Sequence, residues 1–120
     1  MSLHLHSVTM DAADPPALAD FWSKVTGYSV DTASDFFAVL TGDGSVGPRF
    51  MFIKVPEPKT AKNRAHVDFA TPDLEAELTR VVGLGAELVG RYDEYGTKWA
   101  TFRDPEGNEF CIGQHEPPQH

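Results

Sequence analysis

The feature that constrains this chain most is an internal repeat, because the elements predicted over its second half follow those of its first in the same order. Opening strands are predicted at residues 6–10 and again, sixty positions later, at residues 66–70. In each half a helix, a short strand and a two-strand hairpin follow. Repeated supersecondary units of this kind bury their apolar faces together, and the repeat therefore determines the fold class.

Each predicted helix begins with a capping side chain followed by proline, at Asp14-Pro15 in the first half and at Thr71-Pro72 in the second. The cap satisfies a backbone N–H, and proline at the first helical position loses no hydrogen bond. Apolar stripes follow at helical spacing, namely Leu18, Phe21, Trp22, Val25 and Leu74, Leu78, Val81, Val82. A glycine able to take the left-handed conformation ends each helix, and these glycines are Gly27 and Gly85.

The remaining strands are predicted at residues 28–30, 37–40 and 50–53 in the first half and at 86–89, 99–102 and 110–112 in the second, with turns at 41–44 and 104–108. The sequence thus predicts an α+β fold of two βαβββ repeats. We expect the repeats to form an open, curved, mixed β-barrel with the helices outside and a cavity between them. The predicted organisation is a single domain over residues 1–120, with repeats at 4–55 and 65–114 and a connector at 56–64.

Composition restricts the partners of the chain. It has 18 acidic against 10 basic residues and a net charge of −8, which argues against a nucleic-acid partner because phosphate binding needs a clustered positive surface. A lone Cys111 excludes an intramolecular disulfide. The N-terminus shows no signal-peptide pattern, and no apolar stretch has the length of a membrane span. We therefore expect a cytoplasmic protein without a membrane partner.

Several segments carry a family likeness. The Asp14-Pro15 helix start, the FWSKVTGY sequence of residues 21–28 and the DPEGN turn of residues 104–108 resemble the vicinal oxygen chelate superfamily, which includes glyoxalases, bleomycin-resistance proteins and dioxygenases. Residues 55–60 and 62–68 resemble a bacterial glyoxalase-like subgroup. The resemblance spans residues 4 to 114 and implies the fold predicted from the repeat.

The resemblance also implies positions for a metal site. Superfamily enzymes take metal ligands from the first and last strands of each half, and these positions fall on His6, Ile53, His66 and Cys111. His6 and His66 suit a divalent metal, zinc or nickel, whereas Ile53 offers no ligand atom. The Cys111 thiolate suits zinc but not magnesium or manganese; alternatively, Cys111 is a small buried apolar residue. The two histidines equally fit a polar cavity without metal.

Three further residues are candidates for the site. Asp68 shares a strand face with His66, and its carboxylate is a candidate to orient that imidazole, to accept a substrate hydroxyl or to act as general base. The alternative is a solvated carboxylate. Trp99 and Tyr95 on the second-half hairpin are candidates to stack on a ligand or to fill the cavity mouth. The predicted ligand-binding residues are Ile53, Tyr95, Trp99 and Cys111.

Two functions from different classes remain. The first is a glyoxalase-like small-molecule-binding protein with lyase or isomerase activity and an incomplete metal site. The second is a metal-free protein that sequesters a drug or metabolite, as bleomycin-resistance proteins do. In both cases a homodimer is expected, because the helices are apolar and a barrel edge is open.

One basic stretch stands out in this acidic chain, containing Lys54, Lys59, Lys62 and Arg64 at and within the connector. It is a candidate for binding a carboxylate or phosphate or for reaching a partner subunit. A solvated loop is the alternative.

Overall fold

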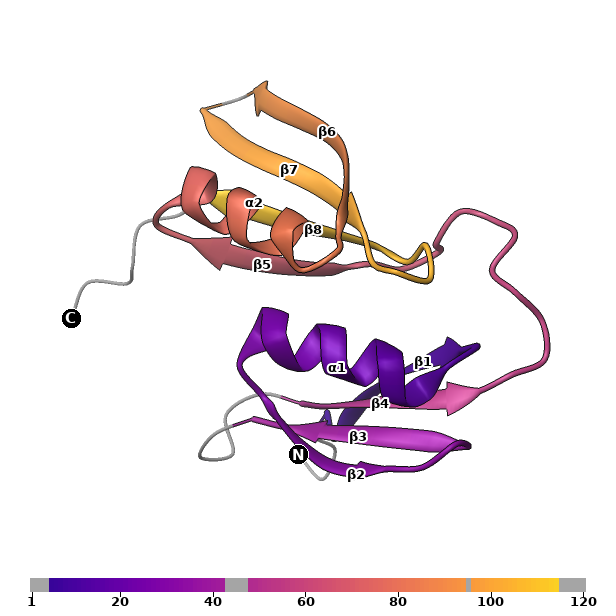
Figure 1. Ribbon diagram of the computed structural model, residues 1–120. Coiled ribbons are helices and arrows are strands. Elements are labelled where there is room, and N and C mark those ends of the chain that lie inside the picture. Colours follow the sequence, from indigo (N-terminus) through magenta and orange to yellow (C-terminus); the bar gives the residue numbers. More distant parts are fainter. Residues whose placement is uncertain (1–4, 43–47, 95, 115–120) are drawn as a thin grey trace. The chain divides into compact units, whose positions relative to one another are not determined.

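A computed structural model describes residues 5–42, 48–94 and 96–114 of the chain. The chain divides into two compact units, Met1–Pro58 and Lys59–His120. The first unit contains β1 (Ser7–Ala12), α1 (Pro15–Thr26), β2 (Ser29–Ala33), β3 (Phe37–Thr41) and β4 (Arg49–Lys54). The second contains β5 (Val67–Thr71), α2 (Leu74–Gly83), β6 (Glu87–Glu94), β7 (Thr97–Arg103) and β8 (Glu109–Gln114). Figure 1 shows the same order of elements in each unit.

Both units have the same sheet topology. The strand order is β1-β4-β3-β2 in the first sheet and β5-β8-β7-β6 in the second. In each sheet the opening strand pairs in parallel with the last strand, and the other neighbours are antiparallel. The predicted α+β class and the doubled βαβββ order are confirmed.

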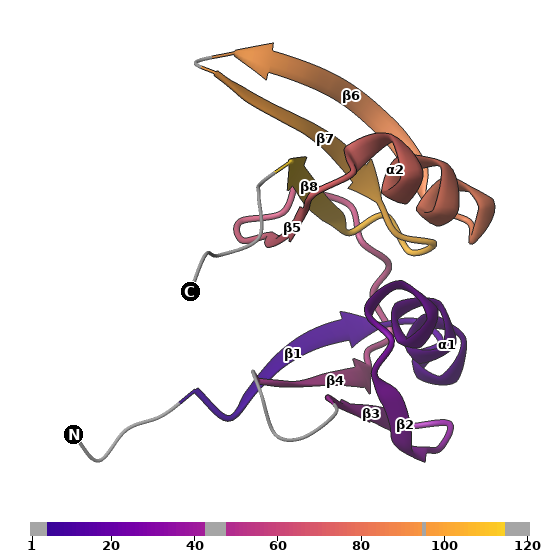
Figure 2. The ribbon, with the colours of Figure 1, turned by 90° about the vertical axis from the view of Figure 1, so that its left-hand side faces the viewer.

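Each helix covers one face of its own sheet (Figure 2). In the first unit Trp22 of α1 is 1% exposed and stacks on Phe50 of β4 at a ring-centroid distance of 6.3 Å. In the second unit α2 packs on β7 and β8, where Phe102 and Phe110 are fully buried and stack at 5.3 Å. Because side chains alternate along a strand, the residues between these aromatics point to the opposite face.

The helix ends agree with the sequence prediction in the first half and correct it in the second. Asp14 caps α1 by accepting from the backbone N–H of Ala17, and Gly27 ends it in the left-handed conformation with φ of 78°. The prediction of a Thr71-Pro72 start for the second helix is wrong. Strand β5 continues through Thr71, and the cap is Asp73, which accepts from the N–H of Ala76 at 3.1 Å.

The turn at residues 104–108 is confirmed and is organised by a buried carboxylate. Asp104 is 4% exposed and accepts from the backbone N–H groups of Glu106 and Asn108, each at 2.9 Å. Gly107 takes a φ of 88°, which favours glycine. The predicted turn at 41–44 falls partly outside the described residues. Neither helix in the described part of the chain has the length and hydrophobicity that a membrane crossing needs.

Candidate functional site

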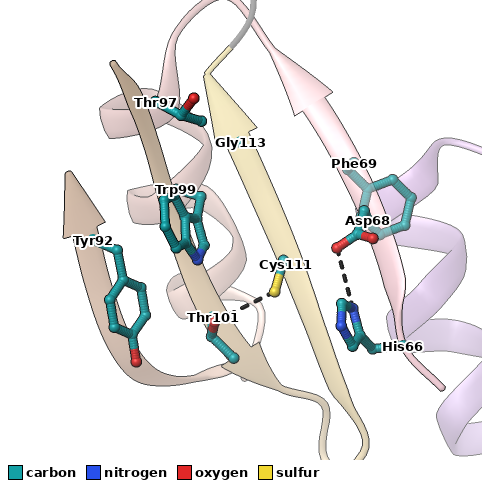
Figure 3. Close-up of a pocket in the computed structure, with 9 residues that line it drawn as sticks. All are labelled: His66, Asp68, Phe69, Tyr92, Thr97, Trp99, Thr101, Cys111 and Gly113. Atoms are coloured by element: carbon teal, nitrogen blue, oxygen red, sulfur yellow. Dashed lines mark hydrogen bonds and ion pairs between the residues drawn. The ribbon is translucent and has the colours of Figure 1, made fainter. Parts of the chain in front are cut away.

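The side of the second sheet that α2 leaves uncovered carries a pocket, and we call this side the site face. The pocket has a volume of about 520 Å³. Its lining comes from all four strands and the residue before β5, and consists of His66, Asp68, Phe69, Tyr92, Thr97, Trp99, Thr101, Cys111 and Gly113 (Figure 3). Trp99 and Thr101 point to this face because side chains alternate along β7. Their neighbours Ala100 and Phe102 are buried on the other side, under the helix.

Three side chains with metal-ligating atoms meet in the pocket. One ligand atom from each of His66, Asp68 and Cys111 lies within 4.8 Å of the others. The register explains the meeting, because Asp68 on β5 pairs with Cys111 on β8 and His66 lies two residues before Asp68. Among the sequence-predicted site residues, the structure therefore brings these three together.

Asp68 contacts the imidazole ring of His66. The Nδ1 atom of His66 lies 3.1 Å from Oδ1 of Asp68, as the dashed line in Figure 3 shows. Because an ionised carboxylate only accepts, this contact places a proton on Nδ1. In the neutral imidazole the Nε2 atom then keeps its lone pair, available to a metal or a substrate proton.

The Cys111 thiol is held in its protonated form. Burial raises the pKa of Cys111, and the neighbouring Asp68 carboxylate raises it further, whereas a hydrogen bond with the Thr101 hydroxyl lowers it. The Thr101 oxygen lies 3.3 Å from the Cys111 sulfur. A thiol of this kind is a poor free nucleophile, and it becomes a thiolate when a cation replaces its proton.

An aromatic pair lies in the same pocket. Tyr92 on β6 and Trp99 on β7 are register partners, and their rings stack at a centroid distance of 5.2 Å and an angle of 22°. Tyr92 is 41% exposed, and Figure 3 shows both rings on the site face. Trp99 was predicted as a ligand-binding residue. Tyr92 and Thr101 were missed, although Thr101 lies two residues beyond Trp99 and so shares its face.

The remaining predicted residues fall elsewhere. Tyr95 lies outside the described residues. His6 and Ile53 belong to the first unit, where both side chains are exposed.

The register also corrects the assumed equivalence of the two halves. Val8 pairs with Phe50 and Val67 with Phe110, and both phenylalanines are buried on the helix side. The counterpart of His66 is therefore Ser7, and not His6, which precedes it. The sequence comparison was one residue out of step, and a shift of one residue moves a side chain to the other face of a sheet.

The same correction applies to the last strands. Cys111 pairs with Thr101, and the matching rung of the first sheet joins Met51 to Val39. Met51 is thus the counterpart of Cys111. Ile53 pairs with Phe37 as Gly113 pairs with Trp99, so Ile53 corresponds to Gly113.

The donor set of the second half fits one class of metal. It combines an imidazole nitrogen, a carboxylate oxygen and a sulfur within 4.8 Å. These are ligands that zinc accepts in tetrahedral sites, whereas magnesium and calcium prefer oxygen alone. The side chains of His66 and Asp68 are 49% and 66% exposed, so solvent or a small molecule can reach these donor atoms.

The fold and the pocket place the chain in a class of small α+β proteins built from paired βαβββ units. A family model described as glyoxalase-like domain matches residues 7–113, and the chain belongs to this family. No functionally curated protein matches the sequence significantly.

Solved structures share the fold at low sequence identity. A glyoxalase/bleomycin resistance protein/dioxygenase family enzyme from Burkholderia phytofirmans PsJN has a TM-score of 0.78 at 20% identity, over 93% of this chain and 98% of that one. The fosfomycin resistance protein FosX from Mesorhizobium loti has a TM-score of 0.73 at 16% identity, over 97% and 94%. A lactoylglutathione lyase from Agrobacterium tumefaciens has a TM-score of 0.68 at 17% identity, over 92% of each chain.

Proposed function

We propose that the chain is a glyoxalase-like, small-molecule-binding enzyme of the lyase or isomerase type and that the site face is its active site. The observation that carries this proposal is the meeting of His66, Asp68 and Cys111 within 4.8 Å, beside the stacked Tyr92 and Trp99 rings. The names of two structural neighbours, a lactoylglutathione lyase and a fosfomycin resistance protein, are consistent with chemistry on small molecules.

His66 and Cys111 would hold a divalent metal, zinc or nickel, with Asp68 as third ligand or as the group that orients His66. When bound, such a metal polarises neighbouring substrate oxygens and stabilises the negative charge that develops on them. The contact between Asp68 and Nδ1 of His66 supports the second role, because a carboxylate–histidine pair of this kind would leave Nε2 available to a metal.

The residues around the cluster have distinct roles in this proposal. Asp68, whose side chain is exposed at the pocket, would take a proton from a substrate carbon or hydroxyl. The Trp99 and Tyr92 rings would hold an apolar or planar part of the substrate by stacking. The Thr101 hydroxyl bonds to the Cys111 sulfur and keeps that side chain in the pocket.

Zinc titration tests the proposal. We expect the chain to bind one zinc ion and the His66→Ala and Cys111→Ser variants to bind it more than about 100-fold more weakly, since loss of an outer-shell partner alone typically lowers affinity ten- to hundredfold. Asp68→Asn should lower the zinc affinity by only about ten- to hundredfold if Asp68 does no more than orient His66. Ser7→Ala and Met51→Leu change the counterpart positions in the first half and should leave the affinity unchanged.

His6→Ala belongs to the same series, because the resemblance implied a metal held jointly by His6 and His66. A loss in His6→Ala equal to that in His66→Ala would support a joint site. Equal, substoichiometric zinc in the unmodified chain and in the His66→Ala variant would rule out metal-assisted catalysis.

A metal-free sequestering protein is the second candidate, favoured by the exposed aromatic stack and by the raised pKa of Cys111. It predicts that a ligand stabilises the chain in the presence of EDTA, by about 2.7 kcal/mol at one hundred times its Kd. Cationic glycopeptides and related aromatic compounds are the probes. Trp99→Ala should abolish the stabilisation and Phe37→Ala, its counterpart in the first half, should not.

We further propose a cytoplasmic homodimer as the working form. Light scattering should then give twice the 13.2 kDa mass of the chain. A species of 13.2 kDa alone would remove the dimer and leave the site proposal unaffected.

A further inference from the structure

A second pocket lies between the middle of the connector and the β7–β8 hairpin. It has a volume of about 460 Å³ and is lined mainly by Lys59, Lys62, Arg103, Gly107 and Glu109. All of these residues belong to the second unit. Three cationic side chains thus face one carboxylate in a chain whose net charge is −8.

The ion pairs within this pocket leave positive charge unbalanced. Lys62 pairs with Glu109, and Arg103 pairs at 3.2 Å with Glu87 of the neighbouring strand. Lys59 donates to the neutral carbonyl of Ala61. The Glu109 side chain is only 12% exposed, whereas that of Lys62 is 78% exposed. Glu87 and Glu109 thus offset two of the three positive charges, and one positive charge remains.

The strand register joins this pocket to the active-site pocket. Arg103 pairs with Glu109, and the next pair pointing to the same face is Thr101 with Cys111. Two residues along a strand span about 7 Å. A ligand of five or six bonds therefore reaches from the cationic side chains to the Cys111 rung.

We propose that Lys59, Lys62 and Arg103 form an oxyanion subsite and that the substrate is a small organic anion. Its carboxylate or phosphate group binds in this pocket, and its remaining atoms lie over Thr101 and Cys111 toward the aromatic pair. The oxyanion subsite stands on its own charges, whereas the placement of the remaining atoms rests on the proposed function of the site face.

Two matched probes test the charge requirement. 4-Phenylbutyrate and 4-phenylbutanamide have the same shape and differ in charge, and 3-phenylpropyl phosphate separates a phosphate from a carboxylate preference. We expect both anions to bind at least about tenfold more tightly than the amide, because hydrogen bonds to charged groups are the stronger ones. The Lys59→Met/Lys62→Met variant should lose this preference. Lys24→Met/Lys54→Met makes the same change in net charge elsewhere and should keep it.

Backbone amide shifts in NMR spectra locate the binding. Titration with inorganic phosphate should give saturable shifts at Lys62, Gly107 and Glu109, which disappear in the Lys59→Met/Lys62→Met variant. Shifts that do not saturate, or that persist in this variant, would mean an adventitious ion only and would overturn the subsite. Equal affinity for the acid and the amide would overturn it too.

The two proposals fail separately in this experiment. If the amide binds on the site face as tightly as the acid, the active-site pocket stands and the oxyanion subsite does not. If phosphate binds saturably while no phenyl probe shifts Trp99 or Thr101, the subsite stands and the proposed substrate placement does not.

Discussion

The two halves of the molecule share a framework and differ in what one face of that framework carries. On the site face of the second half, His66, Asp68 and Cys111 meet beside Trp99 and Thr101. The strand register identifies the equivalent positions of the first half. These positions hold Ser7, Thr9, Met51, Phe37 and Val39. Metal-ligating chemistry is therefore concentrated in the second half.

The comparison teaches that the framework and the site depend on different residues. Both helices are capped by aspartate, and both sheets bury a phenylalanine of the last strand under the helix. These shared residues point toward the helix, whereas the residues that differ point the other way. Because neighbouring strand residues face opposite sides, one half can change its chemistry without disturbing its core.

The largest expected effect tests whether the two cores are equivalent. Phe50→Ala and Phe110→Ala each remove a buried ring from equivalent positions of the two sheets. The phenylalanine residues are 5% and 0% exposed. Each should lower the free energy of unfolding by about 3–5 kcal/mol, since the ring leaves a cavity. Chemical denaturation measures both. A loss in Phe110→Ala less than half of that in Phe50→Ala would show that the second core is packed less tightly.

A smaller effect tests the equivalence of the helix starts. Asp14→Ala and Asp73→Ala each remove a side chain that accepts from a backbone N–H three residues on, at 3.3 and 3.1 Å. Each should destabilise the protein by about 1 kcal/mol, whereas Thr71→Ala should have less effect because Thr71 precedes the cap. Thermal unfolding of the three variants is the measurement. A cost confined to Thr71→Ala would restore the start predicted from sequence.

The smallest effect examines the chemistry of the site described in the second half. Asp68→Asn should lower the pKa of Cys111, because the carboxylate raises it, and Thr101→Val should raise it, because the hydroxyl bond lowers it. Burial, the largest cause, remains in both variants, so the pKa should stay above that of an ordinary thiol. Cys111 is the chain's one cysteine, and the pH dependence of its alkylation by iodoacetamide therefore reports this pKa directly.

The sign of the linked stability effect follows from the same pKa. A thiol whose pKa is raised in the folded state contributes stability that is complete below the unfolded pKa and is lost as the pH rises through the folded pKa. The protein should therefore become less stable in alkaline solution, and Asp68→Asn should reduce that loss. An unchanged alkylation profile in Asp68→Asn would show that the carboxylate does not act on the thiol.

Part of the site was predictable from the sequence for a simple reason. His66 and Asp68 are two residues apart on one strand, so alternation alone predicts a shared face. Cys111 reached the candidate set through the family resemblance, and its contact with Asp68 depends on the parallel pairing of β5 with β8. Tyr92 was missed because its contact with Trp99 depends on the register of a long hairpin.

The sequence by itself determined the repeated order of elements, the first helix cap and the apolar stripes, because these depend on neighbours a few residues apart. The tertiary structure decided which residues of the two halves correspond. His6 resembled His66 in the sequence, but the register assigns that position to Ser7 and pairs Cys111 with Asp68. Backbone hydrogen bonds between distant strands set this register, and a shift of one residue reverses every face.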